Sequence, residues 1–142
     1  MYSSNAPTFT SDAMSLPNKQ PWTSVKLEVL TPMLSRRVLT AEKAMIAQVY
    51  LKKGAIVKAH EHHNEQITYI LEGGLRFWLG ENADKAPNGD YVDVMAGEVL
   101  LIPGGLRHQA EALSDTLDLD VFTPPREDWL NGSDAYIREQ KK

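Results

Sequence analysis

The chain has 142 residues, of which 42% are hydrophobic and 24% charged, a composition typical of one ordinary globular domain. Its net charge of -4 argues against nucleic acid or an anionic membrane surface as the main partner, and no apolar run approaches the roughly 18 residues that span a bilayer. Without cysteine there are no disulfides, a cytoplasmic location is favoured, and any metal must be held by nitrogen and oxygen.

Residues 1–22 are polar and interrupted by prolines, which predicts an arm without a core of its own. The segment SVKLEVL, residues 24–30, then alternates in polarity and predicts a half-buried strand with Val25, Leu27 and Val29 on one face. In the following strand Arg36 and Arg37 are adjacent, so at most one of them points inward.

Residues 44–51 predict another strand, on which Gln48 and Tyr50 share one face. If that face looks into the interior, Gln48 and Tyr50 are candidate substrate-binding residues. The alternative is that they face solvent or a second subunit.

Residues 54–73 contain His60, His62 and His63 between a glycine turn and a β-prone run. Residues two apart on an extended chain point to the same side, so His60 and His62 are able to reach one metal ion. The same alternation predicts Gln66 as the next ligand and places His63 outside the site. Glu65 is the alternative if the strand bulges at Asn64.

A second stretch, residues 97–108, is an apolar strand followed by a Pro-Gly-Gly turn and the remaining histidine, His108. The rest of the chain predicts a hairpin at Gly73–Gly74 and a final strand over 116–122. About eight to ten short strands and no long helix before residue 125 indicate an all-β antiparallel jelly roll. We expect an arm over 1–22, a barrel over 23–125, and a tail over 126–142 with a short helix interrupted at Gly132.

The two histidine stretches resemble the two motifs of the cupin superfamily. Their spacings are Gly54-x5-His60-x-His62-x3-Gln66-x6-Gly73 and Gly97-x5-Pro103-x-Gly105-x2-His108. The resemblance covers roughly residues 40 to 125 and implies a double-stranded β-helix, the jelly-roll barrel of cupins. Gln66 stands where glutamate is usual, and Ala112 stands where asparagine is usual.

Three neutral imidazoles and a neutral amide leave the charge of a divalent cation uncompensated, which favours anionic ligands. We expect one divalent transition metal ion (Zn, Ni, Mn or Fe) on His60, His62, Gln66 and His108.

Together with the glutamine, Asp120-x-Phe122-x3-Arg126 resembles the KdgF-type cupins of pectin and alginate breakdown. This resemblance implies conversion of 4,5-unsaturated monouronates to open-chain keto acids, in effect an isomerase or tautomerase reaction. It implies that Asp120 moves protons, Arg126 pairs with the substrate carboxylate, and Phe122 lines the pocket.

Two other functions stay open. One is a metal-dependent dioxygenase of the cupin class, and the other is a non-catalytic cupin that binds a small molecule. Because cupins often pair through their sheets, we also expect a homodimer.

Overall fold

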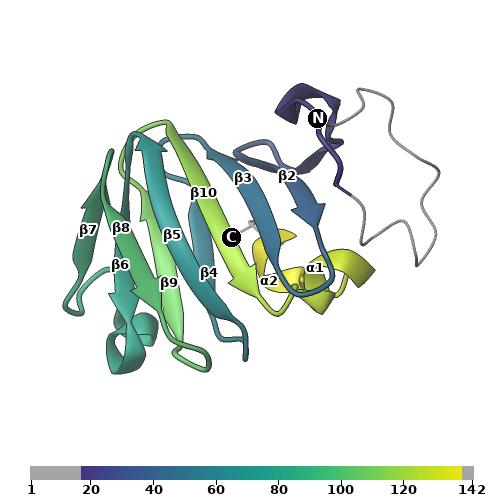
Figure 1. The fold of residues 1–142 in the computed structure, drawn as a ribbon. Helices are drawn as coiled ribbons and strands as arrows, with labels where there is room; N and C mark the ends of the chain where they lie inside the picture. The colour runs from purple at the N-terminus through teal and green to yellow at the C-terminus, as the bar shows by residue number, and fades with distance from the viewer. Residues whose placement is uncertain (1–16, 139–142) are drawn as a thin grey trace.

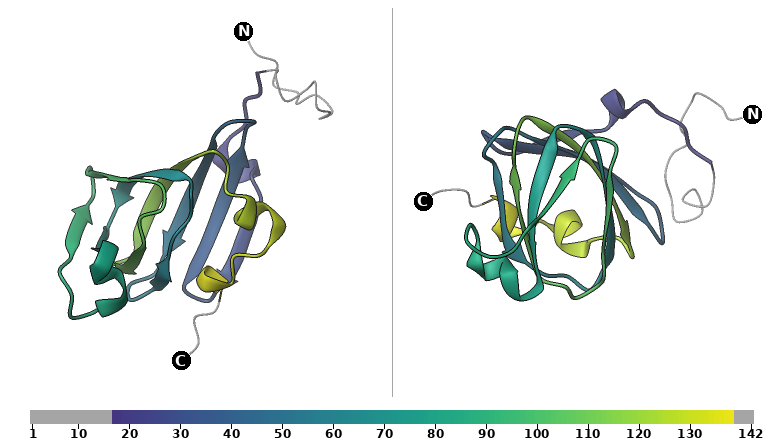
Figure 2. Two further views of the ribbon diagram at one scale, coloured as in Figure 1. Left: turned by 90° about the horizontal axis from the view of Figure 1, so that it is seen from below. Right: turned by 90° about the vertical axis from the view of Figure 1, so that its left-hand side faces the viewer.

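Two antiparallel sheets face each other across a shared apolar interior in the computed structural model, which describes residues 17–138 (Figure 1). Sheet A has the order β1 (Leu27–Thr31), β2 (Leu34–Thr40), β3 (Met45–Leu51), β10 (Thr116–Thr123), β5 (Glu65–Glu72) and β8 (Val99–Ile102). Sheet B has the order β4 (Ile56–His60), β9 (His108–Ala112), β6 (Gly74–Leu79) and β7 (Val92–Met95). This is the expected double-stranded β-helix, and the end-on view shows the strands closing around the interior (Figure 2).

The chain passes from one sheet to the other at Gly73, so the hairpin predicted there is wrong. β5 pairs with β10 and β8, whereas β6 pairs with β7 and β9. Gly73 has a φ of +84°, and a Cβ at this position would clash with the Asp115 backbone and the Thr116 hydroxyl. The glycine pair therefore makes a corner between sheets, because only a residue without a side chain fits so close to β10.

The apolar face predicted for residues 24–30 is buried only at Val25, just before β1, and the prediction is wrong for Leu27 and Val29. Leu27 and Val29 are 42% and 70% exposed, while Glu28 lies beside the fully buried Arg36 with an ion-pair distance of 2.7 Å. Arg36 also forms an ion pair of 2.8 Å with the buried Asp134. A buried guanidinium requires carboxylate partners, and this requirement outweighs the apolar pattern of an edge strand.

Two short helices follow the last strand, α1 (Glu127–Asn131) and α2 (Ala135–Arg138). As expected, the first ends at Gly132, which has a left-handed φ of 82°. The second packs against β4 and β1 and so lies across one side of the barrel opening (Figure 2). These helices bring tail residues to the barrel interior.

Two short 3₁₀ helices, η2 (Trp22–Ser24) and η3 (Gly80–Lys85), complete the elements of the described chain. No helix within residues 17–138 is long and apolar enough to cross a membrane. Residues 1–16 of the expected arm lie outside the described residues, and the boundaries 1–22, 23–125 and 126–142 stay predictions.

Candidate metal centre

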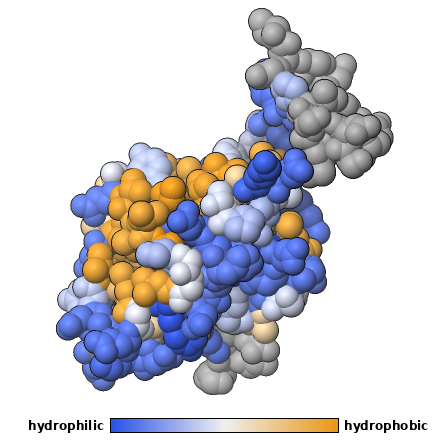
Figure 3. Space-filling view, turned by 60° about the horizontal axis from the view of Figure 1, so that its bottom comes forward, coloured by the Kyte–Doolittle hydropathy of each residue, from blue (hydrophilic) through white to orange (hydrophobic). Residues whose placement is uncertain are grey.

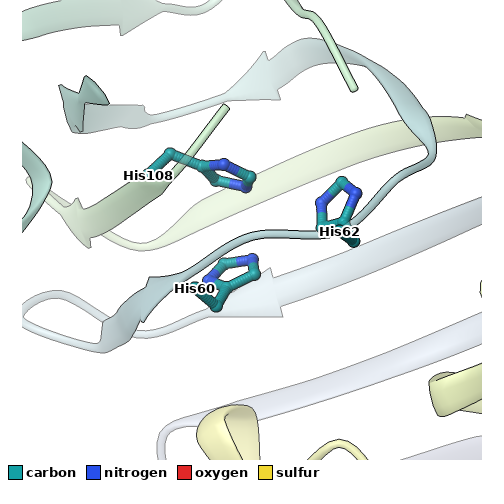
Figure 4. Close-up of side chains that lie close together, drawn as sticks. All are labelled: His60, His62 and His108. Carbon is teal, nitrogen blue, oxygen red and sulfur yellow. The ribbon is translucent and has the colours of Figure 1, made fainter. Parts of the chain in front are cut away.

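Three histidines converge at the opening between the two sheets. His60 ends β4, His108 begins β9, and His62 lies in the loop after β4 (Figure 4). One ring nitrogen from each of the three lies within 4.8 Å of the others. A single ion is therefore within reach of all three, as the spacing predicted.

The register of sheet B places two of these histidines side by side. His60 is opposite His108, and the β4–β9 register shifts by one residue between Val57 and His60. Val57 and His60 consequently both line the interior although they are three residues apart. In a regular strand, residues three apart point to opposite faces. The extra residue in β4 therefore turns His60 to the same side as Val57.

The loop that carries His62 is held against two neighbouring segments. Asn64, which is buried, donates from its amide to the carbonyl of Pro124 at 2.6 Å. The Gly105 amide donates to the His62 carbonyl at 2.7 Å, and a Cβ on Gly104 would clash with the His63 carbonyl. The Pro-Gly-Gly turn therefore supports the loop through its backbone, which explains why glycine is required there.

Hydrogen bonds define which nitrogen of each ring faces the cluster. The Nδ1 atoms of His60, His62 and His108 lie 2.7, 3.1 and 2.8 Å from the carbonyls of Lys58, Asn64 and Leu106. A carbonyl accepts only, so each Nδ1 carries the proton and each Nε2 keeps a free lone pair. Three bare Nε2 atoms are thus directed at one another.

A bound metal cation would satisfy the acceptor atoms of the cluster better than the surrounding protein does. Nε2 of His108 is buried without a hydrogen-bond partner among the described residues. Nε2 of His62 faces Oε1 of Gln66 at 3.2 Å, so two acceptors meet with no proton between them. Buried acceptors without donors are costly in a native protein, and a cation would satisfy all of them at once.

Burial keeps these imidazoles neutral. Desolvation, with a smaller contribution from the charge of His108, lowers the pKa of His60 to about 2. Desolvation and the positive charge of Arg126 lower the pKa of His62 to about 4, and burial also lowers the pKa of His108. Neutral imidazole is the form that binds metals, so the site is ready for an ion over a wide pH range.

Gln66, and not Glu65, faces the histidines. Gln66 is only 6% exposed and its side chain approaches His62, whereas Glu65 is exposed on the opposite face of β5. His63 is exposed as well and takes no part in the cluster. Gln66 as a ligand stays a prediction, and this geometry supports it.

Carboxylates from β10 form the opposite side of the pocket. Asp118 and Asp120 are 4% and 5% exposed, and the Thr68 hydroxyl donates to Oδ1 of Asp120 at 2.8 Å. Burial and the charge of Asp120 raise the pKa of Asp118 well above its usual range. Burial also raises the pKa of Asp120, but hydrogen bonds from Asp118 and Thr68 oppose this. We therefore assign the proton of the pair to Asp118 and the negative charge to Asp120.

Arg126 lies at the mouth of the pocket with most of its hydrogen bonds already made. Its Nε and Nη2 donate to the two carboxylate oxygens of Asp128 at 2.9 and 2.8 Å, and Nη2 also donates to the Tyr136 hydroxyl at 2.6 Å. Tyr136 in turn stacks on His60 with 4.0 Å between ring centroids. The tail thus covers the histidine cluster.

The remaining predicted site residues divide between the two faces of sheet A. Phe122 lines the pocket with Asp120 and Arg126, and its ring lies 5.8 Å from that of His62. Gln48 and Tyr50 do not line the pocket, because the inward face of β3 carries Val49 and Leu51 instead. The Tyr50 hydroxyl donates to Gln48 at 2.6 Å on the outer face. Their assignment to substrate binding is therefore corrected in favour of the outward alternative.

Sequence reasoning did not assign four residues that shape the pocket, namely Thr68, Asp118, Asp128 and Tyr136. The alternation of side chains along β5 and β10 does indicate Thr68 and Asp118, because each lies two residues from Gln66 or Asp120 and so shares its strand face. No local pattern signals Asp128, because the path of the tail brings it to the site. The sequence predicts only that Tyr136 covers one end of the barrel or a neighbour, and in the structure it stacks on His60.

Comparisons with solved structures agree with this architecture. KdgF from Halomonas sp. is 25% identical with a TM-score of 0.62, and the match covers 73% of this chain and 92% of that one. An RmlC-like cupin from Shewanella frigidimarina is 23% identical with a TM-score of 0.66, over 78% and 93% of the two chains. Oxalate decarboxylase from Lactobacillus farciminis, in a formate complex, is 20% identical with a TM-score of 0.63, over 77% of this chain and 36% of that one.

A search of curated proteins found no match. The family model for the cupin domain matches residues 47–123, which is more than half of the chain and includes all three clustered histidines. The fold, the two motifs and this match together show that the chain belongs to the cupin family.

Proposed function

We propose that this cupin is a metal-dependent enzyme that converts a small 4,5-unsaturated uronate to its open-chain keto form. One observation carries the proposal: three of the four neutral donors, a buried aspartate and a buried arginine line the same pocket, and the fourth donor, His62, contacts Gln66 beside it. The structural similarity to KdgF from Halomonas sp. supports it, since the KdgF-type resemblance implies this reaction.

His60, His62, His108 and Gln66 would hold the metal. All four donors are neutral, so a bound divalent ion would retain its charge, attract an anionic substrate, and polarise oxygen atoms of that substrate. The nitrogen-rich, sulfur-free set suits Zn, Ni, Mn or Fe.

Asp120 would carry the proton that the reaction moves. Ring opening removes the proton of the anomeric hydroxyl, forms a carbonyl at C1 and breaks the bond from C1 to the ring oxygen. The resulting enol at C5 becomes a ketone when C4 gains a proton, so the product is an isomer of the substrate. A charged Asp120, oriented by the Thr68 hydroxyl, is suited to take up the first proton and supply the second.

Arg126 would bind the substrate carboxylate through its planar fork. Because Asp128 occupies two donors of that fork, substrate binding requires the carboxylate of Asp128 to be displaced. The cavity volume of about 40 Å³ is also far below the roughly 300 Å³ of small-molecule pockets. We therefore expect α1 and α2 to move aside when substrate enters.

The test is to load the protein separately with Zn, Ni, Mn and Fe, add freshly made unsaturated galacturonate, and follow the loss of its alkene absorbance. We expect loss faster than the spontaneous rate, abolished by Arg126→Ala. Arg76→Ala is the matched control, because Arg76 also forms a two-point ion pair with an aspartate, but at the surface. No acceleration with any metal would contradict the proposal. Oxygen consumption would then indicate a dioxygenase, and a ligand-induced rise in Tm without turnover would indicate a binding cupin.

We also propose that the chain forms a homodimer through the outer face of sheet A. Cross-strand neighbours on this face form an apolar row, Leu39, Ile46, Val121, Ile67 and Leu101, that runs from β2 to β8. Leu101 is 64% exposed and Ile67 is 43% exposed, and Figure 3 shows hydrophobic side chains gathered into one continuous area of the surface. Exposed apolar surface of this kind marks interaction sites.

Light scattering would test this proposal. Leu101→Lys should convert a dimer to a monomer, whereas Val92→Lys, on the exposed part of β7 in sheet B, should leave the mass unchanged. A monomeric wild-type chain would rule out the dimer. The predicted cytoplasmic location stays a prediction.

A further inference from the structure

Gln66 has an amide whose two ends differ in what they offer a metal. The carbonyl oxygen Oε1 is a ligand, whereas the NH₂ group has no lone pair for a cation. In the structure Oε1 faces His62 at 3.2 Å and Nε2 faces Thr68 at 2.8 Å. An amide that rotates by half a turn would present NH₂ to the ion, so the donor set depends on what holds this orientation.

Thr68 supplies the partner that distinguishes the two ends. Its hydroxyl has one proton, which it donates to Oδ1 of Asp120 at 2.8 Å. The lone pairs of Oγ1 are then left to accept, and the only end of the amide that donates is the NH₂ group. Thr68 is fully buried, Asp120 is 5% exposed and Gln66 is 6% exposed, so bulk water does not compete for these groups.

We propose that Thr68 is a positioning residue, which orients the Gln66 amide so that its oxygen, and not its nitrogen, faces the metal. Asp120 determines the direction of the hydrogen bonds, because a charged carboxylate only accepts. The hydroxyl thereby links the metal ligand on β5 to the proton carrier on β10. This inference rests on the proposed metal site and not on the uronate reaction.

The experiment uses Co²⁺ as the probe, because its visible spectrum reports the number and type of its ligands. Thr68→Val keeps the shape of the side chain and removes the hydroxyl. We expect Co²⁺ affinity to fall by about 10 to 100-fold, the usual cost of losing a partner that orients a ligand. We also expect the visible spectrum to change, and Thr68→Ser, which restores the hydroxyl, to recover both the affinity and the spectrum.

Two controls separate positioning from a general structural effect. Thr116 is another buried threonine of sheet A whose hydroxyl is hydrogen-bonded, in this case to the backbone of Gly74, so Thr116→Val should leave the Co²⁺ spectrum unchanged. In a Gln66→Leu background, Thr68→Val should have no further effect on affinity, because Thr68 acts through the amide. This comparison separates an effect that acts through the amide from a general loss of affinity.

The outcomes are distinguishable. A Thr68→Val protein with wild-type affinity and spectrum would overturn the inference while leaving the metal site in place. An equal loss of affinity in the presence and absence of the Gln66 amide would also overturn it. If the wild-type protein fails to bind Co²⁺ at all, the metal site itself is contradicted, and this inference with it.

Discussion

The pocket has two walls of opposite chemical character. We call His60, His62 and His108 the histidine wall, and Thr68, Asp118 and Asp120 the carboxylate wall. His62 and Thr68 do not line the pocket themselves but contact the lining residues Gln66 and Asp120. On the histidine wall, acceptors face one another, and Nε2 of His108 has no hydrogen-bond partner within residues 17–138. On the carboxylate wall, a hydroxyl and an amide supply donors to Asp120 and to Thr68.

This difference shows which part of the site the protein completes by itself. The carboxylate wall meets most of its hydrogen-bonding needs internally, so it is able to fold around a buried charge. The histidine wall leaves its lone pairs to an external cation. Gln66 joins the two walls, since one end of its amide belongs to each.

The largest expected effect is on the histidine wall. His62→Ala should weaken metal binding by more than about 100-fold, since losing even an orienting partner costs 10 to 100-fold. His63→Ala is the matched control, because His63 is the neighbouring residue and is exposed outside the cluster. Metal content after dialysis and calorimetric titration would measure both variants. Similar losses in the two would mean that the loop, and not the ligand, determines affinity.

A pH series would test whether the histidine wall is buried and neutral. The folded-state pKa of His62 is lowered from 6.5 to about 4, so between these values unfolded histidine binds protons that folded histidine does not. The free energy of unfolding should therefore fall as the pH falls through this window, while protons compete with the metal only near pH 4. Metal content and Tm at stepped pH would test this. Release of the metal already at pH 6.5 would contradict the buried, neutral histidine wall.

The smallest expected effect is on the carboxylate wall. The pKa of Asp118 is raised from 3.8, so above that pH the folded protein retains a proton that the unfolded chain releases. Stability contributed by this group is therefore lost as the pH rises. Asp118→Asn should match the wild-type Tm near pH 4 and exceed it at pH 8 by a few degrees, at about 4 °C per kcal/mol.

The control for this effect is Asp90→Asn, since Asp90 is exposed. Its Tm should follow the wild type at every pH. If Asp118→Asn is less stable than the wild type at pH 8, then Asp118 carries the charge and its assignment as the protonated partner is wrong.

Residues whose positions depend on local alternation and turns could be predicted from the sequence alone. The jelly-roll class and the choice of Gln66 over Glu65 as the inward side chain follow from a two-residue period and glycine turns. These features hold because side chains on one strand have no freedom to change face without shifting the register. His60 reaches the histidine cluster only through the register shift in β4.

Features that depend on two distant segments of the chain became apparent only in the folded structure. Alternation places Gln48 and Tyr50 on one face but does not say which face is the interior, and the pairing of β3 with β10 turned that face outward. Leu27 and Val29 were turned outward because Arg36, whose carboxylate partners are Glu28 and Asp134, required burial. Likewise, Asp128 and Tyr136 reach the site only through the path of the tail. A one-dimensional period specifies the two faces of a strand, but the partner that covers each face comes from elsewhere in the chain.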